Sequence, residues 1–96
     1  MGSRSAAKLR RKRHLEVYCD VLADPVWENG CSIRLEDLPP SPGLVADLRR
    51  WARHFTAHDG DDAYWTDDRL AEDAATGDRL RKAVQAELGG RFRVTA

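Results

Sequence analysis

One amphipathic stretch, residues 38–58, constrains the fold of this 96-residue chain more than any other. Ser41 is a favourable N-cap, and Pro42 follows at the first helical position, where its missing N–H costs nothing. Apolar residues then recur at spacings of four, three and four, which is the pattern of one helix face: Leu44, Leu48, Trp51 and Phe55. Val45 and Ala52 widen this face. The stretch predicts a helix that ends near His58, with Gly60 just beyond it as a left-handed C-terminal residue.

A second helix is expected over residues 67–88, with Thr66 as its N-cap. Its apolar face is formed by Leu70, Ala74, Gly77, Leu80, Val84 and Leu88. Glycine lowers helix propensity by about 1 kcal/mol, so Gly77 has two interpretations. Either it lets the two helices approach closely, or the helix breaks at Thr76-Gly77.

Three further segments have the alternating pattern or turn chemistry of β-structure. Residues 14–22 place Leu15, Val17, Cys19 and Val21 on one face. Asn29-Gly30 is typical of a type I′ turn, so residues 26–28 and 31–33 are expected to form a short hairpin. Residues 91–95 alternate again and are expected to pair with the first strand. The fold class is therefore α+β, a small two- to four-stranded sheet packed on an antiparallel helical hairpin in the order β-(ββ)-α-α-β.

Charge divides the chain into two parts. Residues 1–13 contain six of the 16 basic residues and none of the 16 acidic ones. Such a segment is expected to be a disordered basic arm, followed by one acidic domain over residues 14–96. The arm suits a solvated tail first, and an electrostatic contact with nucleic acid, an acidic protein or a membrane surface second.

Cysteine usage and hydropathy indicate a cytoplasmic protein. Cys19 and Cys31 are expected to be reduced, buried and structural, because two cysteines without a nearby third ligand do not form a zinc site. No apolar run follows the basic arm, and no stretch approaches membrane-spanning length. We therefore expect neither a signal peptide nor contact with a membrane.

Residues 15–58 resemble a group of small actinobacterial proteins that have no established activity. The resemblance rests on the turn Asp24-Pro25-Val26-Trp27, on the helix start at residues 38–41, and on the segment LRRWARHF at residues 48–55. The chain departs from that pattern at Pro40, where leucine is expected, and at Gly43. The resemblance implies a short strand and a Trp-containing turn before the helix, and it implies no functional site.

The segment between the two helices, residues 59–68, combines five acids with two aromatic residues. Tyrosine and tryptophan are frequent anchors of protein interfaces, so Tyr64 and Trp65 are candidate protein-binding residues together with Asp59, Asp61 and Asp62. For Trp65 the favoured alternative is a hydrophobic staple on Leu70, which leaves Tyr64 as the more exposed candidate. Glu16, Tyr18 and Asp20 form a second candidate patch.

Two histidines one helical turn apart, His54 and His58, precede these acids. A His-x₃-His pair with carboxylates nearby is a candidate divalent-metal site. However, the metalloprotease motif needs a glutamate directly after the first histidine, where Phe55 stands. The acids also lack the ligand alternation of a calcium-binding EF-hand loop. Histidines at the edge of the core or on the surface, beside a solvated linker, are the simpler interpretation, and no cofactor is expected.

Basic residues suggest an alternative nucleic-acid interface. The candidates are Arg10, Arg11, Lys12 and Arg13 in the arm, and Arg49, Arg50 and Arg53 on the first helix. Phosphate contacts from such residues give salt-sensitive binding that is blind to sequence. Asp47 interrupts the helical patch, and no nucleic-acid-binding motif is present. A solvated arginine face explains the pattern equally well.

Catalytic motifs are missing from the sequence: there is no Gly-x-Ser-x-Gly elbow and no phosphate-binding glycine loop. The leading hypothesis is therefore a small non-enzymatic protein-binding domain, of an inhibitor, immunity or regulatory type, that docks through its acidic aromatic surface. Nucleic-acid or ribosome association through the arm is the alternative, and a metal-dependent activity at His54 and His58 ranks third. The oligomeric state is left open.

Overall fold

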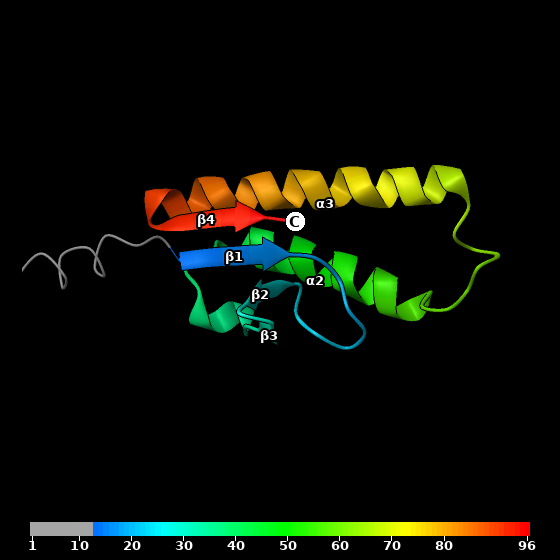
Figure 1. Ribbon diagram of the computed structural model, residues 1–96, viewed down its shortest axis with the longest axis horizontal. Helices are drawn as coiled ribbons and strands as arrows, with labels where there is room; N and C mark the ends of the chain where they lie inside the picture. Colours follow the sequence, from blue (N-terminus) through cyan, green and yellow to red (C-terminus); the bar gives the residue numbers. More distant parts are fainter. Residues whose placement is uncertain (1–12) are drawn as a thin grey trace, which may run out of the picture.

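The computed structural model describes residues 13–96, so Arg10, Arg11, Lys12 and most of the expected basic arm lie outside the described residues. The elements follow one another as β1 (Arg13–Val17), β2 (Val26–Glu28), β3 (Cys31–Ser32), the 3-10 turn η1 (Leu35–Asp37), α2 (Pro42–Ala57), α3 (Asp67–Leu88), the 3-10 turn η2 (Gly89–Arg91) and β4 (Phe92–Thr95) (Figure 1). This order confirms the predicted α+β fold.

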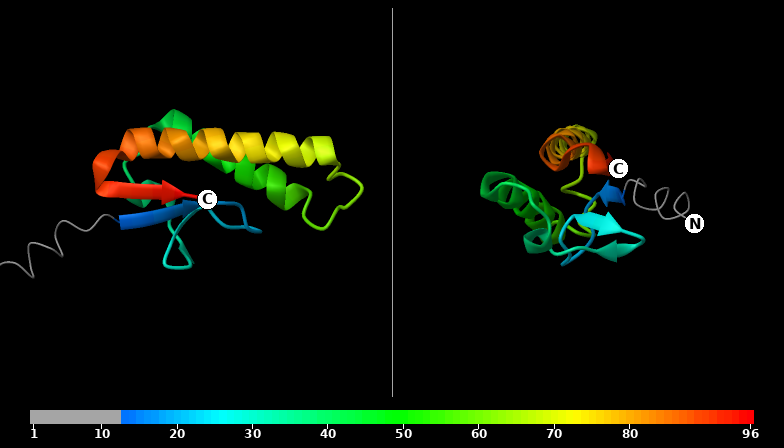
Figure 2. Two further views of the ribbon diagram at one scale, coloured as in Figure 1. Left: turned by 45° about the horizontal axis from the view of Figure 1, so that its top comes forward. Right: turned by 90° about the vertical axis from the view of Figure 1, so that its left-hand side faces the viewer.

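The four strands form one mixed sheet in the order β3-β2-β1-β4. β1 runs antiparallel to β2, with Val17 opposite Val26, and parallel to β4, with Leu15 opposite Val94. Parallel neighbours need a long crossover connection, and here both helices provide it. The helices pack together on one face of the sheet (Figure 2), so the molecule has two layers.

The first strand is shorter than the alternating pattern predicts, and the prediction that it reaches Leu22 is wrong. Val17 is the last residue of β1 that pairs with β2, and β4 pairs only as far as Glu16. Beyond Val17 the Tyr18 N–H still donates to the Pro25 carbonyl at 3.1 Å, but proline has no N–H to continue the ladder, so alternation alone does not keep the chain extended. Residues 18–25 form a loop instead, in which Val21 is 39% exposed.

The predicted hairpin is confirmed. Asn29 and Gly30 have φ values of 53° and 77°, as a type I′ turn requires, and they join β2 to β3. Cys31, expected to be buried, is exposed on this edge strand, because only two residues of β3 pair and no layer covers them. Cys19 is half-buried.

The N-terminal cap of α2 matches the prediction, and Gly60 has the predicted left-handed conformation but lies one residue beyond the expected C′ position. The Ser41 Oγ accepts the Leu44 N–H at 3.4 Å, and the C-terminal cap is His58. Gly60 has a positive φ of 75°, two residues beyond that cap. Ser41 also donates its Oγ–H to Glu87 Oε2 at 2.8 Å, which ties the start of α2 to the last turn of α3.

The close approach of the two helices at Gly77 is confirmed, and the alternative break at this residue is wrong. α3 is continuous, and a Cβ placed on Gly77 would lie 2.8 Å from Trp51 Cζ2. Farther towards its N-terminus, α3 extends beyond the end of β4 (Figure 1), so this part lacks the sheet. Leu70 is consequently 52% exposed and Ala74 is exposed as well, which corrects the predicted buried face at these two positions.

The core lies between the sheet and the helical pair. Its buried side chains come from both strands of the β1–β2 pair, from the segment around η1, and from both helices: Leu15, Val17, Val26, Leu35, Leu38, Leu44, Leu48, Leu80, Val84 and Leu88. Trp51 is half-buried at its edge, as is Phe55 farther along α2, so aliphatic side chains rather than these aromatics dominate the buried stripe.

Candidate protein-binding surface

Tyr64 is the centre of an aromatic cluster at the turn between α2 and α3. Its ring stacks on His58 with 3.5 Å between centroids and 7° between planes. The guanidinium of Arg69 lies 4.3 Å from the centroid of the same ring, and because His58 already covers one face, Arg69 occupies the other. The Tyr64 hydroxyl lies 2.7 Å from His54 Nε2. Tyr64, expected to be the more exposed candidate, is therefore half-buried and held on three sides.

Trp65 packs on α2. Its Nε1–H donates to the carbonyl oxygen of His58 at 2.8 Å, and its ring lies 5.9 Å from His54 and 6.5 Å from Phe55, measured between centroids. Leu70, the expected staple partner, is more than half exposed. We refer to His54, Phe55, His58, Tyr64, Trp65 and Arg69 as the aromatic cluster. Its side chains are already ordered by one another, so a partner would immobilise few of them on binding.

Acidic residues surround this cluster. Asp59, Asp61 and Asp62 are exposed in the turn, and Asp67 and Asp68 are exposed in the first turn of α3. Asp61 also shapes the turn, because its Oδ1 accepts the Tyr64 N–H at 3.2 Å. The surface therefore offers rigid aromatic rings within a negatively charged rim.

A groove of about 320 Å³ lies beside the cluster, between α2 and α3. Trp51 lines it, and the Trp51 Nε1–H donates to Asp73 Oδ1 at 2.8 Å across the two helices. Charged side chains of both signs complete the lining: Asp47, Arg50, Arg69, Glu72, Asp73 and Arg79. The groove thus continues the cluster along the helical pair, with aromatic and charged side chains in its lining.

The structure places His54 and His58 inside the aromatic cluster. Their ring centroids are 4.9 Å apart, but His54 Nε2 is engaged by Tyr64 and the His58 ring is stacked. Among residues 13–96, no three His, Cys, Asp or Glu side chains come together as a potential metal-binding group. The role that this geometry supports for the two histidines is the ordering of Tyr64.

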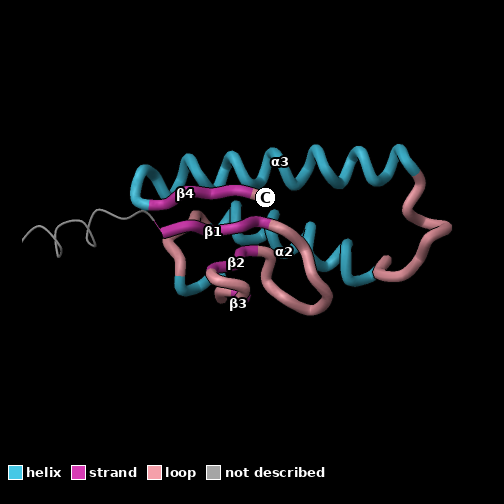
Figure 3. The backbone as a smooth tube through the Cα atoms, viewed as in Figure 1, coloured by secondary structure: helices cyan, strands magenta, loops and turns pink. Residues whose placement is uncertain are grey.

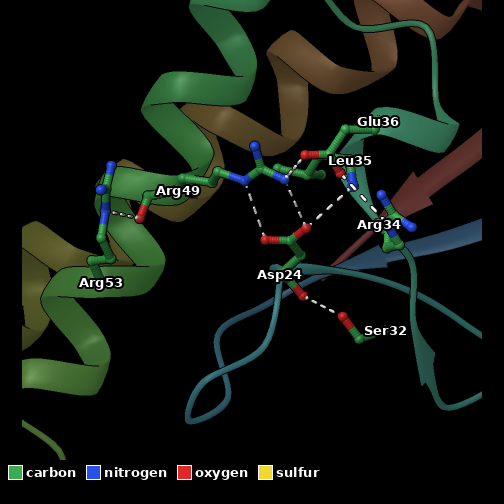
Figure 4. A network of polar contacts seen from close by, with 7 residues as sticks. All are labelled: Asp24, Ser32, Arg34, Leu35, Glu36, Arg49 and Arg53. Atoms are coloured by element: carbon green, nitrogen blue, oxygen red, sulfur yellow. Dashed lines mark hydrogen bonds and ion pairs between the residues drawn. The ribbon is translucent and has the colours of Figure 1, made fainter.

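The arginines predicted to bind phosphate have partners within the protein. Arg49 donates through its Nη2 to Asp24 Oδ2 at 3.2 Å and also to Glu36, which lowers the pKa of Glu36 (Figure 4). Asp24 also accepts the Leu35 N–H at 3.2 Å, so Arg49 fixes the end of the 18–25 loop against η1 and α2.

Other members of the arginine set are engaged in the same way. Arg50 pairs with Asp47 at 2.9 Å, and Arg13 forms a two-pronged pair with Glu28 at 2.8 Å. Ion pairing therefore reduces the positive charge that Arg49 and Arg50 offer to a phosphate. Arg53 differs, because it donates to the neutral Arg49 carbonyl at 3.3 Å.

The second candidate patch lies on the 18–25 loop. Tyr18 stacks on Trp27 with 4.8 Å between centroids and 4° between planes, and the Trp27 Nε1–H donates to the Tyr18 carbonyl at 3.0 Å. The pKa of Tyr18 is raised, first by its partial burial and then by the negative charges of Glu16 and Asp20. Sequence reasoning found this tyrosine but missed its stacking partner, because the pairing depends on the register of β1 against β2.

The two candidate patches are closer than the sequence suggests. The Leu22 N–H donates to Thr56 Oγ1 at 3.2 Å, which joins the 18–25 loop to the last turn of α2, directly before His58. Figure 3 shows that this loop and the turn after α2 both extend beyond the sheet towards the same end of the molecule. Arg69 and Leu22 were not among the predicted site residues, since no local pattern distinguishes them from other surface residues.

Comparison with known protein families assigns the chain to a family. The family described as Serratia CdiI immunity protein-like matches residues 13–95. The chain belongs to this family. A search of curated proteins returned no match. Immunity proteins act by binding another protein, a toxin, so the hypothesis of a small immunity-like protein-binding domain is confirmed at that level.

Burial raises the pKa of the Cys19 thiol to about 12, with a further contribution from Asp73, so the thiol stays protonated at neutral pH. Neither helix of the described residues is long and apolar enough to cross a membrane.

Proposed function

We propose that this chain neutralises a toxin by docking the aromatic cluster and its acidic rim onto a basic face of that toxin. The observation that carries the proposal is the ordering of Tyr64, which is stacked between His58 and Arg69 and bonded to His54. An aromatic ring held in this way presents contact area at a low entropic cost, as interface anchors do.

Charge supports a basic partner. Five of the 16 basic residues lie in residues 1–12, so the described part holds 11 basic and 16 acidic residues, a net charge of −5. Several of those bases are paired with acids inside the fold, whereas the acids around Tyr64 face solvent. Complementary charge of this kind speeds encounter and selects the partner.

Growth rescue tests the proposal. The chain is co-expressed with each candidate toxin encoded beside its gene, and the toxin whose growth inhibition it relieves is taken as the partner. We expect Tyr64→Ala/Trp65→Ala to abolish rescue and to weaken binding at least 100-fold, since anchor residues each contribute roughly 2 kcal/mol or more. Rescue that survives in this variant would remove the aromatic cluster from the interface.

A pair of charge reversals distinguishes the effect of the acidic rim on binding from the effect of overall net charge. Asp62 lies in the rim and Asp37 lies in η1, and both are exposed. Asp62→Lys should slow association with the toxin and reduce its salt dependence, while Asp37→Lys changes net charge equally and should have a smaller effect. Equal effects of the two variants would mean that only overall charge matters.

Nucleic-acid association through the basic arm is the alternative proposal, and the six basic residues before residue 14 support it. Deleting residues 4–13 should then abolish binding to a mixed-sequence duplex, and binding of the full chain should weaken steeply with salt. A mobility shift that survives the deletion would exclude the arm. We also infer a cytoplasmic location, which the two free cysteines support.

A further inference from the structure

The 18–25 loop exposes two aliphatic side chains that the fold does not use. Leu22 is 88% exposed and Val21 is 39% exposed, while every leucine of the core is at most 9% exposed. An exposed leucine forgoes the favourable transfer out of water that the core leucines gain. Solitary exposed apolar residues are common, so exposure alone does not define a site.

The backbone of Leu22 supplies a second, independent observation. Its φ is 59°, in the left-handed region, where a branched side chain crowds the backbone. Among residues 13–96 the only other non-glycine residue with a positive φ is Asn29, in the hairpin turn. Glycine or asparagine would serve a turn at position 22 better, so the turn itself does not explain leucine.

Hydrogen bonds hold the loop in this conformation. Asp20 Oδ1 accepts the Val21 N–H at 2.7 Å, and Thr56 Oγ1 accepts the Leu22 N–H at 3.2 Å. Asp24 anchors the end of the loop on Arg49, as Figure 4 shows. The leucine therefore projects from a braced loop, and its position is set before any partner arrives.

The surroundings indicate what kind of partner fits. Glu16 at the end of β1 and Asp20 in the loop flank Tyr18 in sequence, and their negative charges act on its ring. The aromatic cluster with its acidic rim lies at the same end of α2. An apolar tip with acidic flanks complements an apolar pocket with basic flanks. Two copies of this acidic chain would repel each other at this end, which disfavours self-association through the loop.

We propose that Leu22, with Val21, is an apolar anchor that inserts into an apolar pocket of the toxin, whose basic flanks face Glu16 and Asp20. This inference rests on the proposed neutralisation of a toxin and extends its interface from the aromatic cluster to the 18–25 loop. The loop supplies the apolar contact, and the cluster at the same end of α2 supplies the ordered rings.

The test uses the full chain and the toxin that it neutralises in the rescue assay. Leu22→Gly removes the side chain and relieves the backbone, and Leu22→Asn keeps a residue that tolerates a positive φ. We expect both variants to bind the toxin about 10- to 100-fold more weakly, the range that follows from burying one leucine. The Tm of the free chain should stay unchanged or rise in Leu22→Gly.

Asn29→Gly is the matched control, because it makes the same change at a positive-φ residue in the hairpin turn. It should leave the affinity unchanged. Wild-type affinity in Leu22→Gly would overturn the anchor while leaving toxin neutralisation in place. A Tm that falls in parallel with the affinity would overturn it too, since it would make Leu22 a structural residue.

Sedimentation of the free chain tests the alternative that the 18–25 loop binds a second copy of the same chain. A dimer that is lost in Leu22→Gly would reassign the loop to self-association and overturn the proposal, whereas a monomer at all concentrations supports it. If the wild-type chain rescues no toxin, the proposed function itself fails, and this result is distinct from a Leu22 variant that still binds.

Discussion

Replacing Gly77 with alanine should destabilise this protein, although alanine is the better helix former. The added methyl carbon would lie 2.8 Å from Trp51 Cζ2 and 3.1 Å from Cη2. Carbon atoms in contact normally stay about 3.5–4.0 Å apart, so the ring must move. Its movement is restrained because the Trp51 Nε1–H donates to Asp73 Oδ1 at 2.8 Å.

The opposing contributions can be compared. Alanine gains about 1 kcal/mol over glycine in helix propensity. Overpacking costs about 1–3 kcal/mol, and weakening the bond to the partly exposed Asp73 costs about 1 kcal/mol. We therefore expect Gly77→Ala to lower the free energy of unfolding by about 1–3 kcal/mol, which lowers the Tm of a domain this size by roughly 4–24 °C.

Gly43 provides the matched control in α2. A Cβ at Gly43 meets nothing within 4 Å, so Gly43→Ala should be neutral or stabilise the protein by up to about 1 kcal/mol. Urea denaturation followed by circular dichroism measures both variants, and tryptophan fluorescence reports the displacement of Trp51. If Gly77→Ala proves as stable as Gly43→Ala, the close approach of the helices is not what requires glycine.

Three further variants test contacts that join distant elements. The Gln85 side-chain amide satisfies the outer edge of β4, because its oxygen accepts the Val94 N–H at 2.9 Å and its nitrogen donates to the Phe92 carbonyl at 2.8 Å. Gln85→Ala should therefore lower the free energy of unfolding by about 1–2 kcal/mol in urea titrations. It should also expose this strand edge and promote self-association, which light scattering detects. Ser41→Ala removes the cap of α2 and the hydroxyl's bond to Glu87 Oε2, while the Ser41 N–H can still donate to Glu87 Oε1. It should lower the free energy of unfolding in the same titrations by about 1–2 kcal/mol, and an unchanged value would contradict the capping role. Hydrogen bonding from Arg49 lowers the pKa of Glu36, so the stabilisation from this pair is present above the ordinary pKa of 4.5 and is lost as pH falls through the lowered value. The Tm of Arg49→Met should therefore lie below that of the wild type at pH 7 and approach it under acid conditions. A difference in Tm that stays constant with pH would contradict this.

The candidate site was predictable in its members and not in its geometry. Aromatic residues within an acidic segment marked Tyr64 and Trp65, and the i, i+4 spacing marked His54 and His58. The sequence separated these pairs into a protein-binding and a metal-binding hypothesis. The structure unites them, because the return of the chain into α3 folds Tyr64 onto the histidines and brings Arg69 over its other face.

The predicted arginine surface illustrates the reverse case. Composition and helical spacing placed Arg49 and Arg50 on an exposed face, and the spacing was right. Asp24, the partner of Arg49, lies 25 residues away in the chain, in a loop whose existence depends on where β1 stops. No local pattern connects an arginine to a carboxylate at that separation, so its charge looked free.

The sequence by itself determined the elements whose causes are local. The caps at Ser41 and Thr66, the type I′ turn at Asn29-Gly30 and the periodic faces of both helices each depend on residues within about one turn of one another. Tertiary structure decided what depends on neighbours across the chain. β1 ends at Val17 because β4 pairs no farther than Glu16 and β2 begins at Val26, opposite Val17. Leu22, in the loop that follows, is left in solvent in consequence. Alternation specifies which way a side chain points. Only a partner strand can keep the backbone paired, and only a covering layer can keep the side chain buried.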